Sequence, residues 1–216
     1  MLDRQCARCA VGVLGALAFV AHAQGPTAGL AVGSSGLSVE AGYPLSPDLG
    51  VRGILSGWSF SRDFSDEQVE YAGDLDLSTT GAVLDWHPVG TGFRVTAGLF
   101  LNNNSLSGRA EGEIELDGIP YPELALDAEA DWSRVAPYFG VGYGNSWGLR
   151  GWSFGADLGL LVTGSPSVTV RASGDERIVE DERFLESLER ERLAVEDELS
   201  DLDLYPVVRV GAFYRF

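Results

Sequence analysis

The last eleven residues, 206–216, alternate between two kinds of side chain and end on an aromatic residue. One face of the segment is apolar, and the other carries both of its arginines. Because successive residues of a β-strand point to opposite faces, the pattern predicts a strand. A soluble sheet hides its apolar face in a core, whereas a strand in a bilayer turns that face towards lipid.

An aromatic carboxyl terminus after such a strand is typical of the closing strand of a bacterial outer-membrane β-barrel. We therefore expect this segment to contact the barrel-assembly machinery as an insertion signal. The residues expected to carry that signal are Val208, Val210, Tyr214 and Phe216.

Residues 1–23 have the composition of a secretory signal peptide. Two arginines precede an apolar stretch over 10–20, and Ala21-His22-Ala23 supplies the small-residue cleavage pattern. The stretch is too short for a membrane-spanning helix. Both cysteines of the chain, Cys6 and Cys9, lie inside this segment. The mature protein is therefore expected to have no disulfide and no thiolate metal site.

The remaining segment, 24–216, is long enough for one domain and is strongly acidic. It holds 31 acidic residues and 13 arginines, a formal charge of −18, and the chain has no lysine. Phosphate would be repelled, so nucleic acid is not an expected partner. No run of 18 apolar residues follows the signal. A closed barrel is then the remaining structure that can span a bilayer, because lipid cannot satisfy an open strand edge.

Period-two alternation predicts six strands after residue 48. The segment 28–43 must supply two more, because bacterial barrels have an even strand number. Its alternation switches at 33–36, where either a hairpin or a bulge would fit. A second switch near 78–81 indicates a bulge. We predict an all-β, antiparallel, up-and-down transmembrane barrel of eight strands. The six segments are 49–60, 69–86, 93–102, 132–144, 152–163 and 206–216.

Short and long connections alternate along the chain, as in outer-membrane barrels with short periplasmic turns and long external loops. The short ones are 44–48, 87–92 and 145–151, and the long ones are 61–68, 109–130 (with a hairpin tip at Asp117-Gly118) and 171–202. Aromatic residues should then form one girdle at each rim. The periplasmic girdle is Trp86, Phe93, Tyr143, Trp152, Tyr214 and Phe216, and the outer one is Trp58, Phe60, Tyr71 and Trp132.

Residues 175–203 hold 13 acidic residues and four arginines, without Gly, Pro or Thr. Apolar residues at helical spacing, interrupted by Arg192, predict an amphipathic acidic helix of about six turns in the last external loop. It is either a solvated helix packed on neighbouring loops, a lid on the barrel mouth or an oligomer contact. The apolar positions are Leu185, Leu188, Val195, Leu199 and Leu202.

Charged residues of both signs fall on the predicted inward faces. A barrel of eight strands is just wide enough for its side chains to fill, and buried charges must be paired. They form either a structural ion-pair network or a narrow polar path with separate sites for the two charges of a zwitterion. The candidate lumen residues are Glu40, Arg52, Asp85, Arg94, Arg134, Asp157 and Arg209.

No pattern of catalytic or metal-binding residues is present. His87 is the sole histidine of the mature segment and lies in a predicted turn before Pro88. Zinc spacings, phosphate loops and nucleophile elbows are absent from the sequence. We expect no cofactor, no metal and no enzymatic activity.

Five segments, in this order and spacing, resemble the CarO-type family of small outer-membrane barrels. They are Val32–Gly36, Val83–Pro88, Val135–Gly140, Gly155–Val168 and Tyr205–Phe216. The resemblance implies an eight-stranded barrel and passage of small basic amino acids such as ornithine. It supplies no residue-level transport motif, and the external loops here are shorter and more acidic.

The sequence thus predicts an integral barrel in the outer membrane of a Gram-negative bacterium, in contact with lipid and lipopolysaccharide and monomeric. The expected activity is passive diffusion of small solutes, cationic amino acids among them, through a narrow channel. One alternative is a plugged barrel that serves envelope integrity or surface contact. The other is a secreted soluble β-sandwich with an acidic helix.

Overall fold

The computed structural model describes residues 25–66, 69–88, 92–116, 119–144, 150–200 and 202–216. The expected signal segment and the hairpin tip at Asp117-Gly118 lie outside this part of the chain. The strands are β1 (Thr27–Gly33), β2 (Gly36–Pro44), β3 (Leu49–Asp66), β4 (Val69–Trp86), β5 (Phe93–Asn102), β6 (Ser105–Leu116), β7 (Ile119–Asp131), β8 (Val135–Gly144), β9 (Gly151–Val162), β10 (Ser167–Ser173) and β11 (Leu204–Arg215); the helices are α1 (Glu176–Val179) and α2 (Glu182–Leu199).

Eight of the described strands close into an antiparallel ring in the order β1-β2-β3-β4-β5-β8-β9-β11, and β11 pairs with β1. Within the ring, each of these described strands therefore has a partner on both sides. The predicted eight-stranded barrel is confirmed. Its first two strands form a hairpin around residues 34–35, so the switch of alternation there marks a turn.

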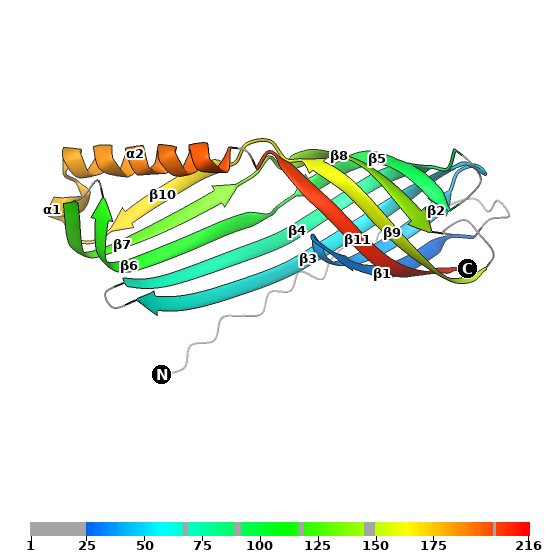
Figure 1. The fold of residues 1–216 in the computed structure, drawn as a ribbon, viewed down its shortest axis with the longest axis horizontal. Coiled ribbons are helices and arrows are strands. Elements are labelled where there is room, and N and C mark those ends of the chain that lie inside the picture. Colours follow the sequence, from blue (N-terminus) through cyan, green and yellow to red (C-terminus); the bar gives the residue numbers. More distant parts are fainter. Residues whose placement is uncertain (1–24, 67–68, 89–91, 117–118, 145–149, 201) are drawn as a thin grey trace.

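The sheet does not stop at the barrel rim (Figure 1). The first half of β4 pairs with β6, β6 pairs with β7, and β7 pairs with β10. Together with the matching half of β3, these strands form what we call the external sheet. The segments 61–68 and 109–130 were expected to be loops, and that prediction is wrong: β3 extends to Asp66, and β6 and β7 occupy most of 109–130. In the third expected long connection, 171–202, β10 extends to Ser173 and the two helices follow.

The outward face of the barrel is apolar. Within the described ring strands, every charged side chain lies on the inward face or on the part of β3 and β4 beyond the ring. The alternation predicted for β5, β8, β9 and β11 is confirmed. Large side chains on the outward face include Leu30, Val39, Leu55, Leu84, Leu99, Phe139, Leu158, Leu160, Val208 and Val210.

One girdle of aromatic residues surrounds the end of the barrel where β1 begins and β11 ends. Phe93 lies opposite Tyr143, and Trp152 lies opposite Tyr214. The Tyr214 ring makes edge contacts with Trp152 and Phe216, at centroid distances of 5.4 and 5.1 Å. All six members of the predicted periplasmic girdle are exposed.

The second predicted girdle does not form, because the expected bulge near 78–81 is absent. β3 and β4 stay in register from Leu49↔Trp86 to Asp66↔Val69. Trp58, Phe60 and Tyr71 therefore lie on the face that continues the lumen, and not on the face that continues the outside of the barrel. The change of alternation marks the point at which β4 leaves the barrel.

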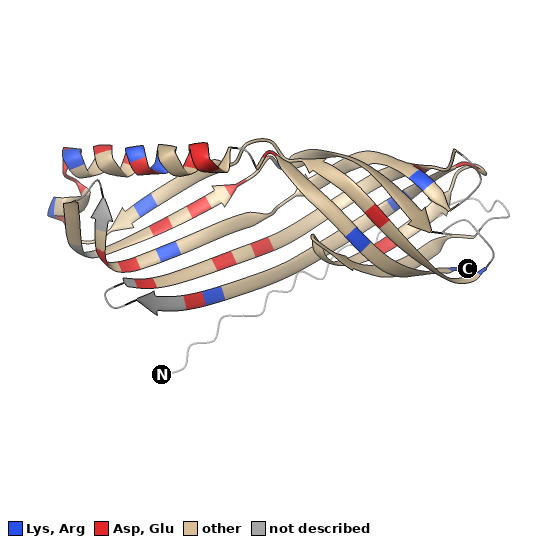
Figure 2. Cartoon of the chain, in the orientation of Figure 1, with Lys and Arg blue, Asp and Glu red and all other residues tan. Residues whose placement is uncertain are grey.

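Beyond that point the two faces of the sheet differ in polarity. The face that continues the outside of the barrel is rich in carboxylates, and Figure 2 shows acidic positions spread over the external sheet and α2. Such a face belongs in water. The carboxylates on this face include Asp74, Asp76, Glu111, Asp127, Glu129 and Asp131.

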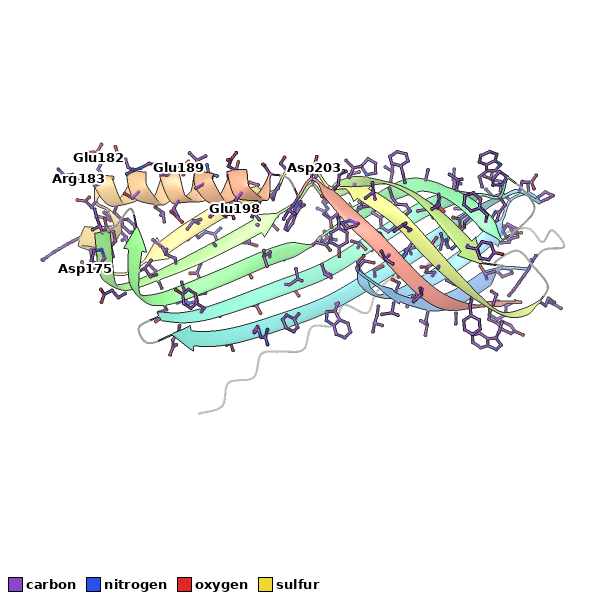
Figure 3. All side chains as sticks on the ribbon, in the orientation of Figure 1. Asp175, Glu182, Arg183, Glu189, Glu198 and Asp203 are labelled. Atoms are coloured by element: carbon purple, nitrogen blue, oxygen red, sulfur yellow. The ribbon has the colours of Figure 1, made fainter. Side chains whose placement is uncertain are left out.

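The acidic segment is helical, as predicted, but it forms two helices. Asp181 divides them, because its side chain accepts hydrogen bonds from the backbone N–H groups of Arg183 and Phe184 and so caps α2. Phe184 is buried, whereas Leu185 is exposed and lies off the apolar stripe. The labelled residues in Figure 3 follow the segment from Asp175 at α1 to Asp203 beside β11.

Arg192 does not interrupt the packing of α2. Its guanidinium donates to the backbone oxygen of Val168 at 3.3 Å and forms ion pairs with Glu189 and Glu196. The hydrogen bonds from Arg192 lower the pKa of the Glu189 carboxyl below its ordinary value. The arginine thus joins the middle of α2 to the start of β10.

None of the described helices is both long enough and apolar enough to cross a membrane.

Closure of the barrel can be tested with a disulfide between the first and last strands. Leu30 and Ala212 are direct partners, and such pairs have Cα atoms close enough for a disulfide. The pair Leu30→Cys/Ala212→Cys should crosslink on mild oxidation, seen as a shift on non-reducing gels. Leu30→Cys/Val208→Cys is the control, because four residues of offset add roughly 13 Å. Equal crosslinking of both pairs would contradict the ring.

Candidate functional site in the barrel lumen

Six charged side chains from six different strands meet inside the barrel. We call them the charged layer. Strand alternation points each of them inward, and each residue is at most 6% exposed, so they are held away from bulk water. Three are arginines and three are acids, which makes the layer neutral. The members are Glu40 (β2), Arg52 (β3), Asp85 (β4), Arg94 (β5), Asp157 (β9) and Arg209 (β11).

Arg52 lies at the centre of the layer and contacts all three acids. Its Nη1 is 2.7 Å from Glu40 Oε2 and 3.0 Å from Asp157 Oδ2. Its Nε and Nη2 donate to the two oxygens of Asp85 at 2.9 and 3.0 Å. The planar guanidinium suits this role, because it directs several donors at once towards carboxylates.

The other two arginines complete the layer from opposite sides. Arg94 Nη2 donates to Asp157 Oδ1 at 2.8 Å, and Arg209 Nη1 lies 3.5 Å from Glu40 Oε1. Asp85 also accepts a hydrogen bond of 2.7 Å from the hydroxyl of Thr96. Each acid is therefore shared between at least two arginines.

A layer of apolar side chains lies next to the charged layer, towards the external sheet. We call it the apolar layer. Ile54 and Val207 each stand two residues along their strand from a charged-layer arginine, so they point into the lumen one step further on. The members are Ile54, Val83, Phe100, Ala136, Tyr138, Leu161 and Val207.

Two aromatic rings fill the width of the lumen in this layer. Phe100 and Tyr138 meet edge to face with ring centroids 5.4 Å apart. Glycines opposite them make the room: a Cβ on Gly81 would lie 2.4 Å from the Phe100 ring, and one on Gly159 would lie 2.5 Å from the Tyr138 hydroxyl. The rings and the glycines therefore form complementary surfaces inside the lumen.

Six of the seven predicted lumen residues thus come together, and Arg134 does not. It is exposed and precedes the first residue of β8, where the alternation of that strand has not yet begun. Placing it in the lumen was wrong, because the predicted strand began too early, at residue 132. Sequence reasoning also missed Thr96, although its inward position follows from the same alternation that identified Arg94.

The four residues of the expected insertion signal, at 208, 210, 214 and 216, are all exposed on or beside the outward face of β11. His87 is buried in the turn after β4. Among the residues that the structure describes, no group of three or more His, Cys, Asp and Glu side chains is arranged to hold a metal ion.

No protein-family model matches the chain, and no curated protein is significantly similar to it in sequence. The crystal structure of CarO2 from Acinetobacter baumannii is similar over 90% of this chain and 100% of that chain, with a TM-score of 0.59 and 17% identity. The present chain therefore has the CarO fold. The CarO structure from the same organism is similar over 88% and 97% of the two chains, with a TM-score of 0.59 and 18% identity.

The resemblance to CarO expected from the sequence is therefore confirmed for the fold. The similarity extends over most of the chain, so it includes the barrel that carries the charged layer. At 17–18% identity it describes the backbone arrangement and leaves the roles of individual side chains to be argued from this structure.

Removal of Arg52 should destabilise the barrel strongly. Arg52→Ala would leave three buried acids with two arginines, and breaking such a buried network costs about 3–5 kcal/mol. Urea unfolding of the protein in detergent micelles would measure the loss. Arg134→Ala is the matched control and should change the free energy of unfolding by less than about 0.5 kcal/mol. Similar losses for both variants would show that the charged layer does not contribute to stability as described.

Proposed function

We propose that this protein is an integral outer-membrane β-barrel of a Gram-negative bacterium with a closed lumen, and that it displays the external sheet and α2 at the cell surface. The proposal involves no catalysis. The uncharged outward face supports insertion, because a charged side chain at the centre of a bilayer costs several kcal/mol. Lipid and lipopolysaccharide would then contact that face.

The orientation follows from the carboxylates of the external sheet. The outward face of β3 and β4 is apolar within the barrel and acidic beyond it. The two strands must therefore leave the bilayer where this change occurs. The end at which β1 begins and β11 ends then faces the periplasm, as in other outer-membrane barrels with short periplasmic turns. The exposed C-terminal residues, ending at Phe216, would be available there to the assembly machinery during insertion.

The packed lumen is the single observation that carries the closed-barrel proposal. A neutral charged layer, whose residues are at most 6% exposed, and an apolar layer with two aromatic rings succeed one another along the axis. Moving a solute past them would separate buried ion pairs and displace both rings. The plugged barrel considered from the sequence is therefore favoured over the channel.

A narrow channel is the second candidate. Charges of both signs inside the lumen favour it, as does the acidic external sheet, which would concentrate cationic solutes near the barrel mouth. Under this alternative the two layers must rearrange during passage.

Planar-bilayer recordings of refolded protein separate the two candidates. We expect no current steps for the natural chain, and steps for the triple variant Arg94→Ala/Phe100→Ala/Tyr138→Ala, which removes side chains from both layers. The matched control truncates the outward-facing neighbours instead, as Val95→Ala/Leu99→Ala/Phe139→Ala, and should remain silent. Regular steps from the natural chain would overturn the closed lumen and favour the channel.

Trypsin treatment of intact cells tests the orientation. The exposed arginines Arg177, Arg183 and Arg190 lie on α1 and α2, so cleavage there should release defined fragments while the barrel stays in the membrane. Replacing these three and Arg192 with glutamine provides the control and should abolish those fragments. Complete protection of the natural chain on cells, with cleavage after lysis, would contradict a surface location.

A further inference from the structure

The inner surface of the barrel continues as one face of the external sheet. Because β3 and β4 keep their register, the side of β4 that carries Thr79 and Val83 in the lumen carries Tyr71 and Leu75 beyond the rim. The pairing of Gly73 with Gly108 carries the same face onto β6. Among the described side chains, this face is apolar apart from Arg62 on β3, and it carries none of the carboxylates of the opposite face.

α2 lies over that face but packs tightly against it only near its N-terminal end. Phe184, 1% exposed, is buried there with Leu124 and forms an edge contact with Tyr121 at 5.1 Å. Further along, Arg192 holds the helix to the Val168 backbone oxygen. Near the C-terminal end of α2, a space separates the helix from the sheet.

That space is a groove of about 480 Å³. α2 contributes Val195 and Leu199 to its wall, and β10 contributes Val168 and Val170. The floor consists of residues too small to reach the helix, which is why the groove stays open. These floor residues are Gly73, Gly108, Ala110, Ala128 and Ala130.

A second apolar cavity of about 310 Å³ lies at the junction of the external sheet and the barrel, bordered by Leu77, Trp132 and Leu204. Leu75 lines this cavity, Leu106 lines the groove, and the two residues are direct partners in the β4–β6 pair. The two spaces therefore meet across one strand pair. Together they offer an elongated apolar surface that leads towards the closed barrel mouth.

The charge around the groove selects against anions. Glu191 on α2 lines its margin, and the sheet carries its carboxylates, Glu129 among them, on the opposite face. The side chain of Arg109 lies on that opposite face as well, paired with Asp127 and Glu111. A fatty acid or a phospholipid headgroup would meet net negative potential here, whereas an ammonium group would be attracted.

We propose that this groove binds a single-chain cationic amphiphile, with the alkyl chain between α2 and the small residues of the sheet and the ammonium group near Glu191. The volume is within the range of small-molecule sites, and the lining is apolar with few polar groups, as such sites require. The inference rests on the proposed function only in that the external sheet must face water.

Photocrosslinking in lipid nanodiscs tests the proposal. The probe is a dodecylamine with a diazirine at the end of its alkyl chain, and dodecanoic acid with the same diazirine is the comparison. Mass spectrometry should find amine adducts on peptides of β7, β10 and α2, with weaker labelling by the acid. Adducts confined to the outward faces of the barrel strands would show membrane partition only and would overturn the proposal.

Two pairs of variants make the test specific. Ala128→Trp fills the groove and should reduce labelling of its peptides roughly tenfold, about 1.4 kcal/mol of binding. Thr169→Trp adds the same bulk to the opposite face of β10 and should leave labelling unchanged. On the helix, Val195→Gln should weaken labelling and Ala194→Gln should not. Equal labelling of all four variants would overturn the groove as the site.

These results remain separable from those on the proposed function. Nanodisc labelling does not depend on which side of a cell the groove faces, and channel recordings do not depend on the groove. If the amine does not label the groove and the bilayer recordings show no current steps, the closed-barrel proposal stands and only the ligand proposal fails.

Discussion

The unbroken register between β3 and β4 is the constraint on which the rest of the structure depends. Over 18 residues β3 and β4 stay paired, so each side chain keeps its face from the pair Leu49↔Trp86 to the far tip. Within the barrel, one set of side chains faces outward and is apolar, and the other is buried in the lumen. Beyond the rim the same alternation continues, so the side chains that would face inward form one surface of the external sheet. The lumen and the groove are therefore two regions of one face.

Period-two alternation was sufficient to predict most of the barrel. It assigned inward and outward faces for β5, β8, β9 and β11 correctly, and it identified Arg52, Arg94 and Arg209 as lumen residues. It could not predict which acid contacts which arginine, because that depends on register between strands that are distant in sequence. The central position of Arg52, in contact with residues up to 105 positions away, is of this kind.

The errors have related physical causes. The change of alternation in β4 was interpreted as a bulge, since a bulge and an exit from the barrel produce the same sequence pattern. β6 and β7 were assigned to a loop because glycine, alanine and acidic residues replace the usual large apolar side chains there. In the structure those small residues form the floor of the groove. A pattern search that expects a lipid face or a core face finds neither in such a strand.

The charged layer also differs from an ordinary core in what can disturb it. Its positive members are all arginines, and a guanidinium keeps its proton at any pH that a cell meets. Alkaline surroundings that would discharge a lysine therefore leave these three ion-pair centres charged. The barrel interior should accordingly tolerate a rise in pH far better than a lysine-based interior would.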